Sequence, residues 1–182
     1  PSGEMDLETY RNIGEAFEYV EQIEDYGVGG VPVANLGVWR TGEEAADEGV
    51  VNMLLETQTD FSVVDPDGEL GQFRAVILTG AACLSDGQAE KLNDYVANGG
   101  GLLVLGRSGL DREGNQFLLD LGAKFVGEPN YCDDYLMVGD VLGEALVSSP
   151  FLNYEAAVRV EAEEDTEVLA AIREPYFDRT YE

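Results

Sequence analysis

The sequence predicts an α/β domain with a mostly parallel sheet covered by helices, and two apolar runs with the segment between them carry this prediction. Residues 75–78 and 102–105 are apolar runs too short for helices, which favours buried strands. Residues 86–97 between them have the spacing of an amphipathic helix. A crossover of this length joins two parallel strands in a right-handed βαβ unit.

The helix of this unit has clear start and stop signals. Ser85 is a favourable N-cap, and Gln88 three residues later completes a capping box. The sequence Asn-Gly-Gly-Gly at 98–101 tolerates the positive φ angles that end a helix. One face of the helix carries its apolar residues, Ala89, Leu92, Tyr95 and Val96.

Residues 1–30 form a different kind of segment, which we interpret as an N-terminal connecting helix before an α/β domain at 31–182. Asp6 can cap this helix, and Gly27, Gly29 and Gly30 end it. Its apolar stripe needs a covering surface, which is either an upstream part of a larger protein or the chain's own domain. The stripe contains Leu7, Tyr10, Ile13, Phe17, Val20 and Ile23.

The remaining elements are weaker predictions. Before the central unit we expect a strand at 31–38, a helix at 43–57 and a strand at 60–64. After it we expect a short helix at 115–121, a strand at 124–126, an irregular stretch at 128–150, and strands at 156–162 and 168–173.

Composition excludes several classes of partner. The 182 residues include 37 Asp and Glu against 10 Lys and Arg, for a net charge of −27. Such a charge repels nucleic acid and anionic membranes, so we expect neither as a partner. The acidic residues are dispersed and only two of the bases are lysine, which indicates a halophilic protein with an acidic surface.

The chain has two cysteines, Cys83 and Cys132, and no histidine. Two cysteines do not make a disulfide framework in a chain of this length, which favours a reducing, cytoplasmic location. Two cysteines alone cannot close a zinc site, and the Asp-Pro-Asp-Gly at 65–68 lacks the later ligands of a calcium loop. We therefore expect no metal and no cofactor.

The predicted ligand site lies beyond the carboxyl ends of the strands, where open parallel sheets bind ligands. Two arginines at this edge either bind a carboxylate or sugar hydroxyls or pair with the acids Asp111 and Glu43, and pairing is favoured. The candidate ligand-binding residues are Arg40, Thr79, Gly80, Arg107, Ser108 and Asp111.

Ser108 at a sharp strand-to-loop turn is also a candidate nucleophile. A serine hydroxyl needs an adjacent base, and neither histidine nor a suitably spaced lysine is available. A serine that caps a following helix is the favoured alternative. Cys83 before the Ser85 cap is a second candidate, but without a basic partner it is better explained as a small core residue.

The stretch from Val76 to Gly109 resembles the class I glutamine-amidotransferase-like fold, in the variant known as the beta-galactosidase trimerisation domain. The resemblance rests on a strand, a small-residue loop, the pattern LSDGQAEKLNDYVANGGG and a second strand, and it extends over about residues 31–182. The final segment from Glu174 to Glu182 also resembles glycosidase-like proteins.

The resemblance implies a flavodoxin-like three-layer sandwich that follows the catalytic barrel of a glycoside hydrolase. True amidotransferases carry a cysteine at the position of Ser108 and a later histidine, so their activity is not implied here. The resemblance implies a non-catalytic domain that serves oligomerisation, for example as a trimer, or shapes the active site of the barrel. A carbohydrate-binding module and a hydrolase using Ser108 or Cys83 are the alternatives.

Overall fold

A computed structural model describes residues 6–177. The chain divides into two compact units, Pro1–Val33 and Ala34–Glu182. The last residues of the predicted glycosidase-like segment, 178–182, lie outside the described residues.

The first unit contains one helix, α1 (Leu7–Gly27). The prediction that Asp6 caps it is confirmed, because the Asp6 carboxylate accepts hydrogen bonds from the amides of Glu8 (3.1 Å) and Thr9 (3.3 Å). No residue of α1 is buried. Within residues 6–33 no second helix or strand is present to cover its apolar stripe.

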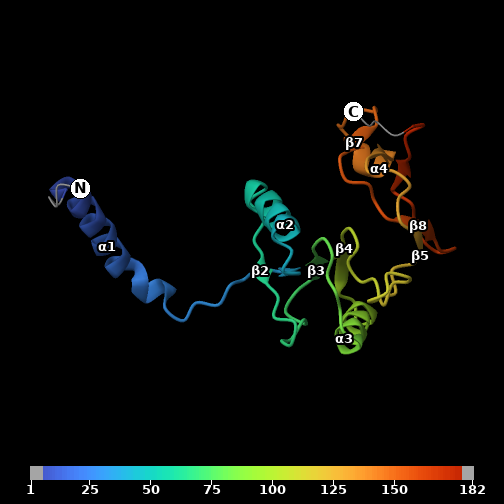
Figure 1. Ribbon diagram of the computed structural model, residues 1–182. Helices are drawn as coiled ribbons and strands as arrows, with labels where there is room; N and C mark the ends of the chain where they lie inside the picture. The colour runs from blue at the N-terminus through green and yellow to red at the C-terminus, as the bar shows by residue number, and fades with distance from the viewer. Residues whose placement is uncertain (1–5, 178–182) are drawn as a thin grey trace. The chain divides into compact units, whose positions relative to one another are not determined.

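The second unit begins with a four-stranded parallel sheet (Figure 1). The strand order is β2-β1-β3-β4, and every neighbouring pair is parallel. The bounds are β1 (Leu36–Trp39), β2 (Ser62–Val63), β3 (Ala75–Leu78) and β4 (Gly101–Val104). The predicted βαβ unit is confirmed, since β3 and β4 pair directly and α3 (Asp86–Ala97) connects them.

Helices cover both faces of this sheet. Val50 of α2 (Glu44–Glu56) packs with Val38 and Ile77 on one face. On the other face, Ala89 and Leu92 of α3 pack in the cluster that contains the alternate β3 residues, Val76 and Leu78. Figure 1 shows α2 and α3 on opposite sides of the strands. The predicted α/β sandwich with a parallel sheet is confirmed.

The chain after the sandwich is built from antiparallel strands. β5 (Ala123–Gly127) pairs with β8 (Arg159–Ala162). A second sheet has the order β7-β6-β9, formed by β7 (Phe151–Asn153), β6 (Asp134–Val138) and β9 (Ala170–Arg173). A one-turn helix, α4 (Asp140–Gly143), follows β6.

Two sequence predictions for the chain after the central βαβ unit are wrong. Residues 115–121 are not helical, because tertiary hydrogen bonds take over their backbone: the Asn93 side chain donates to the Leu118 carbonyl and accepts from the Asp120 amide. Residues 128–150 are not wholly irregular, since they contain β6 and α4. After the buried Asp134, the β6 residues are all half-buried rather than alternately buried and exposed, so the segment lacks the period-2 pattern of a strand.

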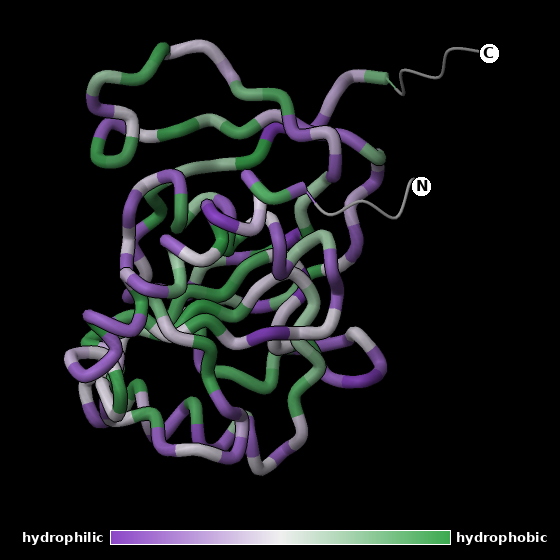
Figure 2. The backbone as a smooth tube through the Cα atoms, turned by 90° about the vertical axis from the view of Figure 1, so that its left-hand side faces the viewer, coloured by the Kyte–Doolittle hydropathy of each residue, from purple (hydrophilic) through white to green (hydrophobic). Residues whose placement is uncertain are grey.

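The apolar core is confined to the sandwich. All buried apolar residues of the described chain lie between Val38 and Leu119. After Leu119 the only buried described residue is Asp134. In Figure 2 the strands of the sandwich form hydrophobic segments side by side in the middle of the view. The antiparallel region at 123–177 therefore has no apolar core of its own.

Candidate functional site

The carboxyl ends of three strands meet at one edge of the parallel sheet. The β1–β3 register pairs Trp39 with Leu78, and the β3–β4 register pairs Leu78 with Val104. The loops that follow these residues therefore start side by side. All six predicted ligand residues lie in or just after these loops.

Asp47, on the first turns of α2, is the centre of the hydrogen bonds at this edge. Its carboxylate is buried and accepts from the amides of Thr41 (2.9 Å) and Gly42 (3.0 Å) and from the Thr79 hydroxyl. Burial alone would raise the pKa of Asp47, but these hydrogen bonds together lower it below its usual value. Asp47 thus fixes the β1–α2 loop to the end of β3.

Ser108 has no exposed surface. Its hydroxyl donates to the Thr79 carbonyl (3.1 Å) and accepts from the Ala82 amide (2.9 Å). The serine therefore joins the loops after β3 and β4. The expectation that it caps a following helix is wrong, since turns follow it. As a nucleophile it would have to break both hydrogen bonds and move to the surface.

Two glycines bring these loops into close contact. Gly80 and Gly106 both have φ = +58°. A Cβ on Gly106 would lie 2.5 Å from the Gly80 carbonyl oxygen, and a Cβ on Gly80 would lie 2.3 Å from the Cβ of Ala46. A side chain on Gly106 would push the two loops apart, and one on Gly80 would push the start of α2 away from the end of β3.

Both arginines of the predicted site pair with acids, as favoured, although with other partners than expected. Arg107 makes a two-pronged ion pair with Glu128, with 2.6 Å between Nη2 and Oε1. This hydrogen bonding raises the pKa of Arg107 and lowers that of Glu128. The Nε atom of Arg40 lies 3.7 Å from Asp47.

The carboxylate of Asp111 accepts from the amide of Asn115 (2.8 Å). Since Thr79 and Ser108 are fully buried, a ligand at this edge would meet Arg40, Arg107 and Asp111 first. Ligand binding by the six residues stays a prediction.

Cys83 is exposed next to the Ser85 capping box, which is present as predicted, so the expectation of a buried core cysteine is wrong. Over residues 6–177, no group of three or more Cys, Asp or Glu residues is placed to hold a metal ion. No helix in the described part of the chain is long and apolar enough to cross a membrane.

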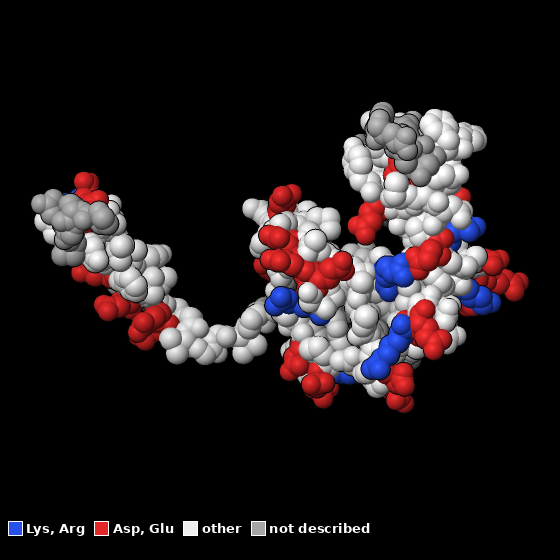
Figure 3. Space-filling model, in the orientation of Figure 1, with Lys and Arg blue, Asp and Glu red and all other residues white. Residues whose placement is uncertain are grey.

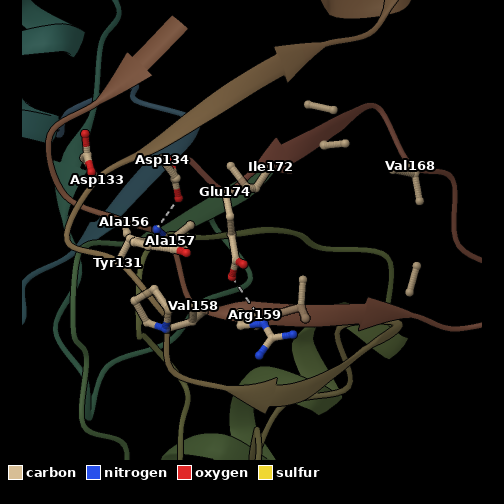
Figure 4. A pocket seen from close by; sticks show the side chains of 15 residues that line it. Tyr131, Asp133, Asp134, Ala156, Ala157, Val158, Arg159, Val168, Ile172 and Glu174 are labelled. Atoms are coloured by element: carbon tan, nitrogen blue, oxygen red, sulfur yellow. Dashed lines mark hydrogen bonds and ion pairs between the residues drawn. The ribbon is translucent and has the colours of Figure 1, made fainter. Parts of the chain in front are cut away.

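Sequence reasoning did not find a cavity of about 580 Å³ in the antiparallel region. Residues before β6 and residues of β8 and β9 line it (Figure 4). Figure 4 shows Glu174 pointing toward Arg159, and Asp134 pointing toward the backbone of Ala157. The lining residues are far apart in sequence and mostly small, so no motif marks them.

Carboxylates are spread over the surface. Figure 3 shows Asp and Glu scattered over the visible face, with few Lys and Arg among them. Apart from Asp47 and Asp134, no described acidic residue is buried.

Solved structures with the same fold are sugar-processing enzymes. An alpha-L-fucosidase isoenzyme 2 from Paenibacillus thiaminolyticus is 30% identical over 99% of this chain, with a TM-score of 0.86. A beta-galactosidase from Bacillus circulans sp. alkalophilus is 15% identical over 98% of the chain, with a TM-score of 0.74. Gan42B, a GH42 beta-galactosidase, is 12% identical over 97%, with a TM-score of 0.72.

The predicted resemblance to this domain of glycoside hydrolases is confirmed. The chain spans only 29–30% of the length of each of these proteins, so it is similar to one part of each enzyme. No family model and no curated protein sequence matches the chain.

Proposed function

We propose that this chain is a non-catalytic domain of a larger glycoside-hydrolase-like protein, where it serves oligomerisation or shapes the active site of a catalytic barrel. One observation carries the proposal: nearly the whole chain is similar, at 30% identity, to less than a third of a fucosidase. Fold alone does not give function, so the residues of the chain must support the role.

The chemistry of the strand-end loops supports a non-catalytic role. Ser108, at the nucleophile position, is buried and hydrogen-bonded on both sides, and the sequence contains no histidine to activate it. Cys83 is exposed but equally lacks a histidine partner.

Two uncovered regions support an assembly role. The α1 stripe has no covering element within residues 6–33, and the antiparallel region has no apolar core. A stripe of exposed apolar side chains is typical of a surface that contacts another protein. The proposed partners are a catalytic barrel of the same polypeptide or further copies of this chain, in a high-salt cytoplasm.

The catalytic part of the proposal is tested with the purified chain. It should hydrolyse neither glutamine, nor simple esters, nor aryl glycosides above the rate of buffer. Turnover that disappears in Ser108→Ala or Cys83→Ala would show that the domain is an enzyme.

The assembly part is tested by light scattering at several protein concentrations. The chain should associate, and Phe17→Asp in the α1 stripe should reduce the association. Tyr19→Asp is the matched control, because Tyr19 is also an exposed aromatic of α1 but lies outside the stripe. A monomer at all concentrations, with α1 amides protected from hydrogen exchange, would mean that α1 packs on its own domain.

A further inference from the structure

The cavity in the antiparallel region stays open because many of the side chains that line it are small. Five of its lining residues are alanines, namely Ala156, Ala157, Ala162, Ala170 and Ala171. Facing strands in protein interiors normally fill such space with larger side chains, at the density of organic crystals. Here the sequence leaves about 580 Å³ open, within the range of small-molecule sites.

The wall of the cavity is fixed by a buried carboxylate. Asp134, at the start of β6, is 2% exposed. It accepts hydrogen bonds from the Ala157 amide (2.7 Å) and the Asn153 side chain (2.8 Å). These bonds tie the 156–157 segment to β6 and β7. The cavity wall is therefore held in place before any guest arrives.

Donors and acceptors are mixed along the polar side of the cavity. The Nε atom of Arg159 lies 3.7 Å from Glu174, and the Asn130 side chain donates to both Glu174 oxygens (2.9 and 3.0 Å). A guanidinium has five N–H donors, so Arg159 keeps donors for a guest. The Tyr131 hydroxyl can both donate and accept.

An unused acceptor lies in the same wall. Asp133 lines the cavity, and its Oδ1 atom is buried without a hydrogen-bond partner. Buried polar atoms are normally paired, and a donor from a guest that shifts this side chain slightly would satisfy it.

We propose that this cavity binds a neutral sugar of one or two rings. Hydroxyl groups donate and accept at once, which matches a lining with both carboxylates and a guanidinium. The alanines with Val158 and Ile172 suit the C–H face of a sugar ring. An anion would be repelled by the net charge of −27, whereas a cation would be attracted by the three carboxylates of the lining and is therefore the competing guest that the test includes. The proposal does not depend on the assembly role.

The test is a titration of the purified full chain with galactose, fucose and lactose, followed by amide NMR, with putrescine as a cationic probe. At least one sugar should give saturable shifts, concentrated at residues 129–134 and 156–174. Shifts with putrescine alone, shifts confined to other residues, or no saturable shift would each overturn the proposal.

Two variant pairs locate the sugar. Ala170→Phe fills the cavity and should abolish binding, whereas Ala97→Phe at an exposed alanine of α3 should bind as the unmodified chain does. Arg159→Gln should weaken binding roughly tenfold, since it removes charged hydrogen bonds, and Arg112→Gln outside the cavity should not.

If circular dichroism shows that Ala170→Phe does not fold, the comparison of Arg159→Gln with its control Arg112→Gln tests the proposal instead. Unchanged affinity in Arg159→Gln would then overturn the proposal. Neither result depends on whether the chain associates or hydrolyses a substrate, so the failure of this proposal and of the assembly role are distinguishable.

Discussion

The parallel sandwich at 34–122 and the antiparallel region at 123–177 belong to one compact unit but differ in what stabilises them. The sandwich contains every buried apolar residue of the described chain, and the antiparallel region contains none. Strand pairing alone gives modest net stability, because backbone groups exchange hydrogen bonds with water for hydrogen bonds with each other. The sandwich is therefore stabilised by the burial of apolar side chains. The stability of the antiparallel region depends on the surfaces that contact it.

The two regions also differ in charge density. From the sequence, residues 34–122 hold 15 acidic and 5 basic residues, a net charge of −10 over 89 residues. Residues 123–177 hold 12 acidic and 3 basic residues, a net charge of −9 over 55 residues. The region without a core thus carries the denser negative charge.

The largest expected effect comes from removing a core side chain. Leu92→Ala in α3, at 0% exposure, should lower the free energy of unfolding by about 2–5 kcal/mol. The same change at the half-buried Leu152 of β7 should cost about 1 kcal/mol. Urea unfolding of both variants measures the difference, and equal costs would mean that the antiparallel region shares the core's stability.

Salt should affect the antiparallel region most. Raising potassium chloride from 0.1 M to 2 M shortens the Debye length from about 10 Å to below about 3 Å, which screens repulsion between carboxylates. The melting temperature should rise by roughly 5–10 °C, equivalent to a few kcal/mol. Hydrogen exchange should show the larger gain in protection in β6 and β9.

A melting temperature that is flat between these salt concentrations would contradict the halophilic interpretation. The acidic surface would then call for a cationic partner.

The hydrogen bonds of Ser108 hold two loops of the sandwich together. Ser108→Ala leaves the Ala82 amide and the Thr79 carbonyl without their buried partner, and should cost about 1–3 kcal/mol. Ser148→Ala, at an exposed serine of the antiparallel region, is the control and should stay within about 0.5 kcal/mol. Similar melting temperatures for the two variants would rule out the structural role of Ser108.

The smallest expected effect is the pH dependence of Asp47. Its folded pKa is lower than the unfolded value of 3.8, so its hydrogen bonds stabilise the fold above that value. The contribution is lost as the pH falls from the unfolded pKa through the folded one. Asp47→Asn should cost about 1–2 kcal/mol at pH 7 and less at pH 3.

Urea unfolding of both proteins at several pH values measures the effect of Asp47. A cost that stays constant down to pH 3 would show that the charge of Asp47 contributes nothing.

The sequence predicts the sandwich well because local signals and burial agree there. The bounds of β3 and the capping box of Ser85 with Gln88 match the structure. In the antiparallel region β5, β8 and β9 overlap the predicted strands at 124–126, 156–162 and 168–173, whereas β6, β7 and α4 were missed. After the buried Asp134 the β6 residues are all half-buried, so no period-2 alternation marks this strand. The false helix at 115–121 shows how one distant side chain, that of Asn93, can override a local preference.

The candidate sites divide in the same way. Placing six residues at the strand-end edge needed only the topology rule for parallel sheets. Their actual partners could not be predicted, because Asp47 and Glu128 reach this edge from other elements. The alanine-lined cavity was missed, since residues from 129 to 174 meet there only in the folded chain.

The contact between Gly80 and Gly106 restricts how such sequences can evolve. Neither position accepts a side chain unless α2 or the neighbouring loop moves, and both backbones are left-handed. Surface acids can drift freely among relatives, but these two glycines can change only together with their surroundings. Among divergent sequences, paired glycines 26 positions apart, one after each of two buried strands, would be a more durable mark of common ancestry than overall identity.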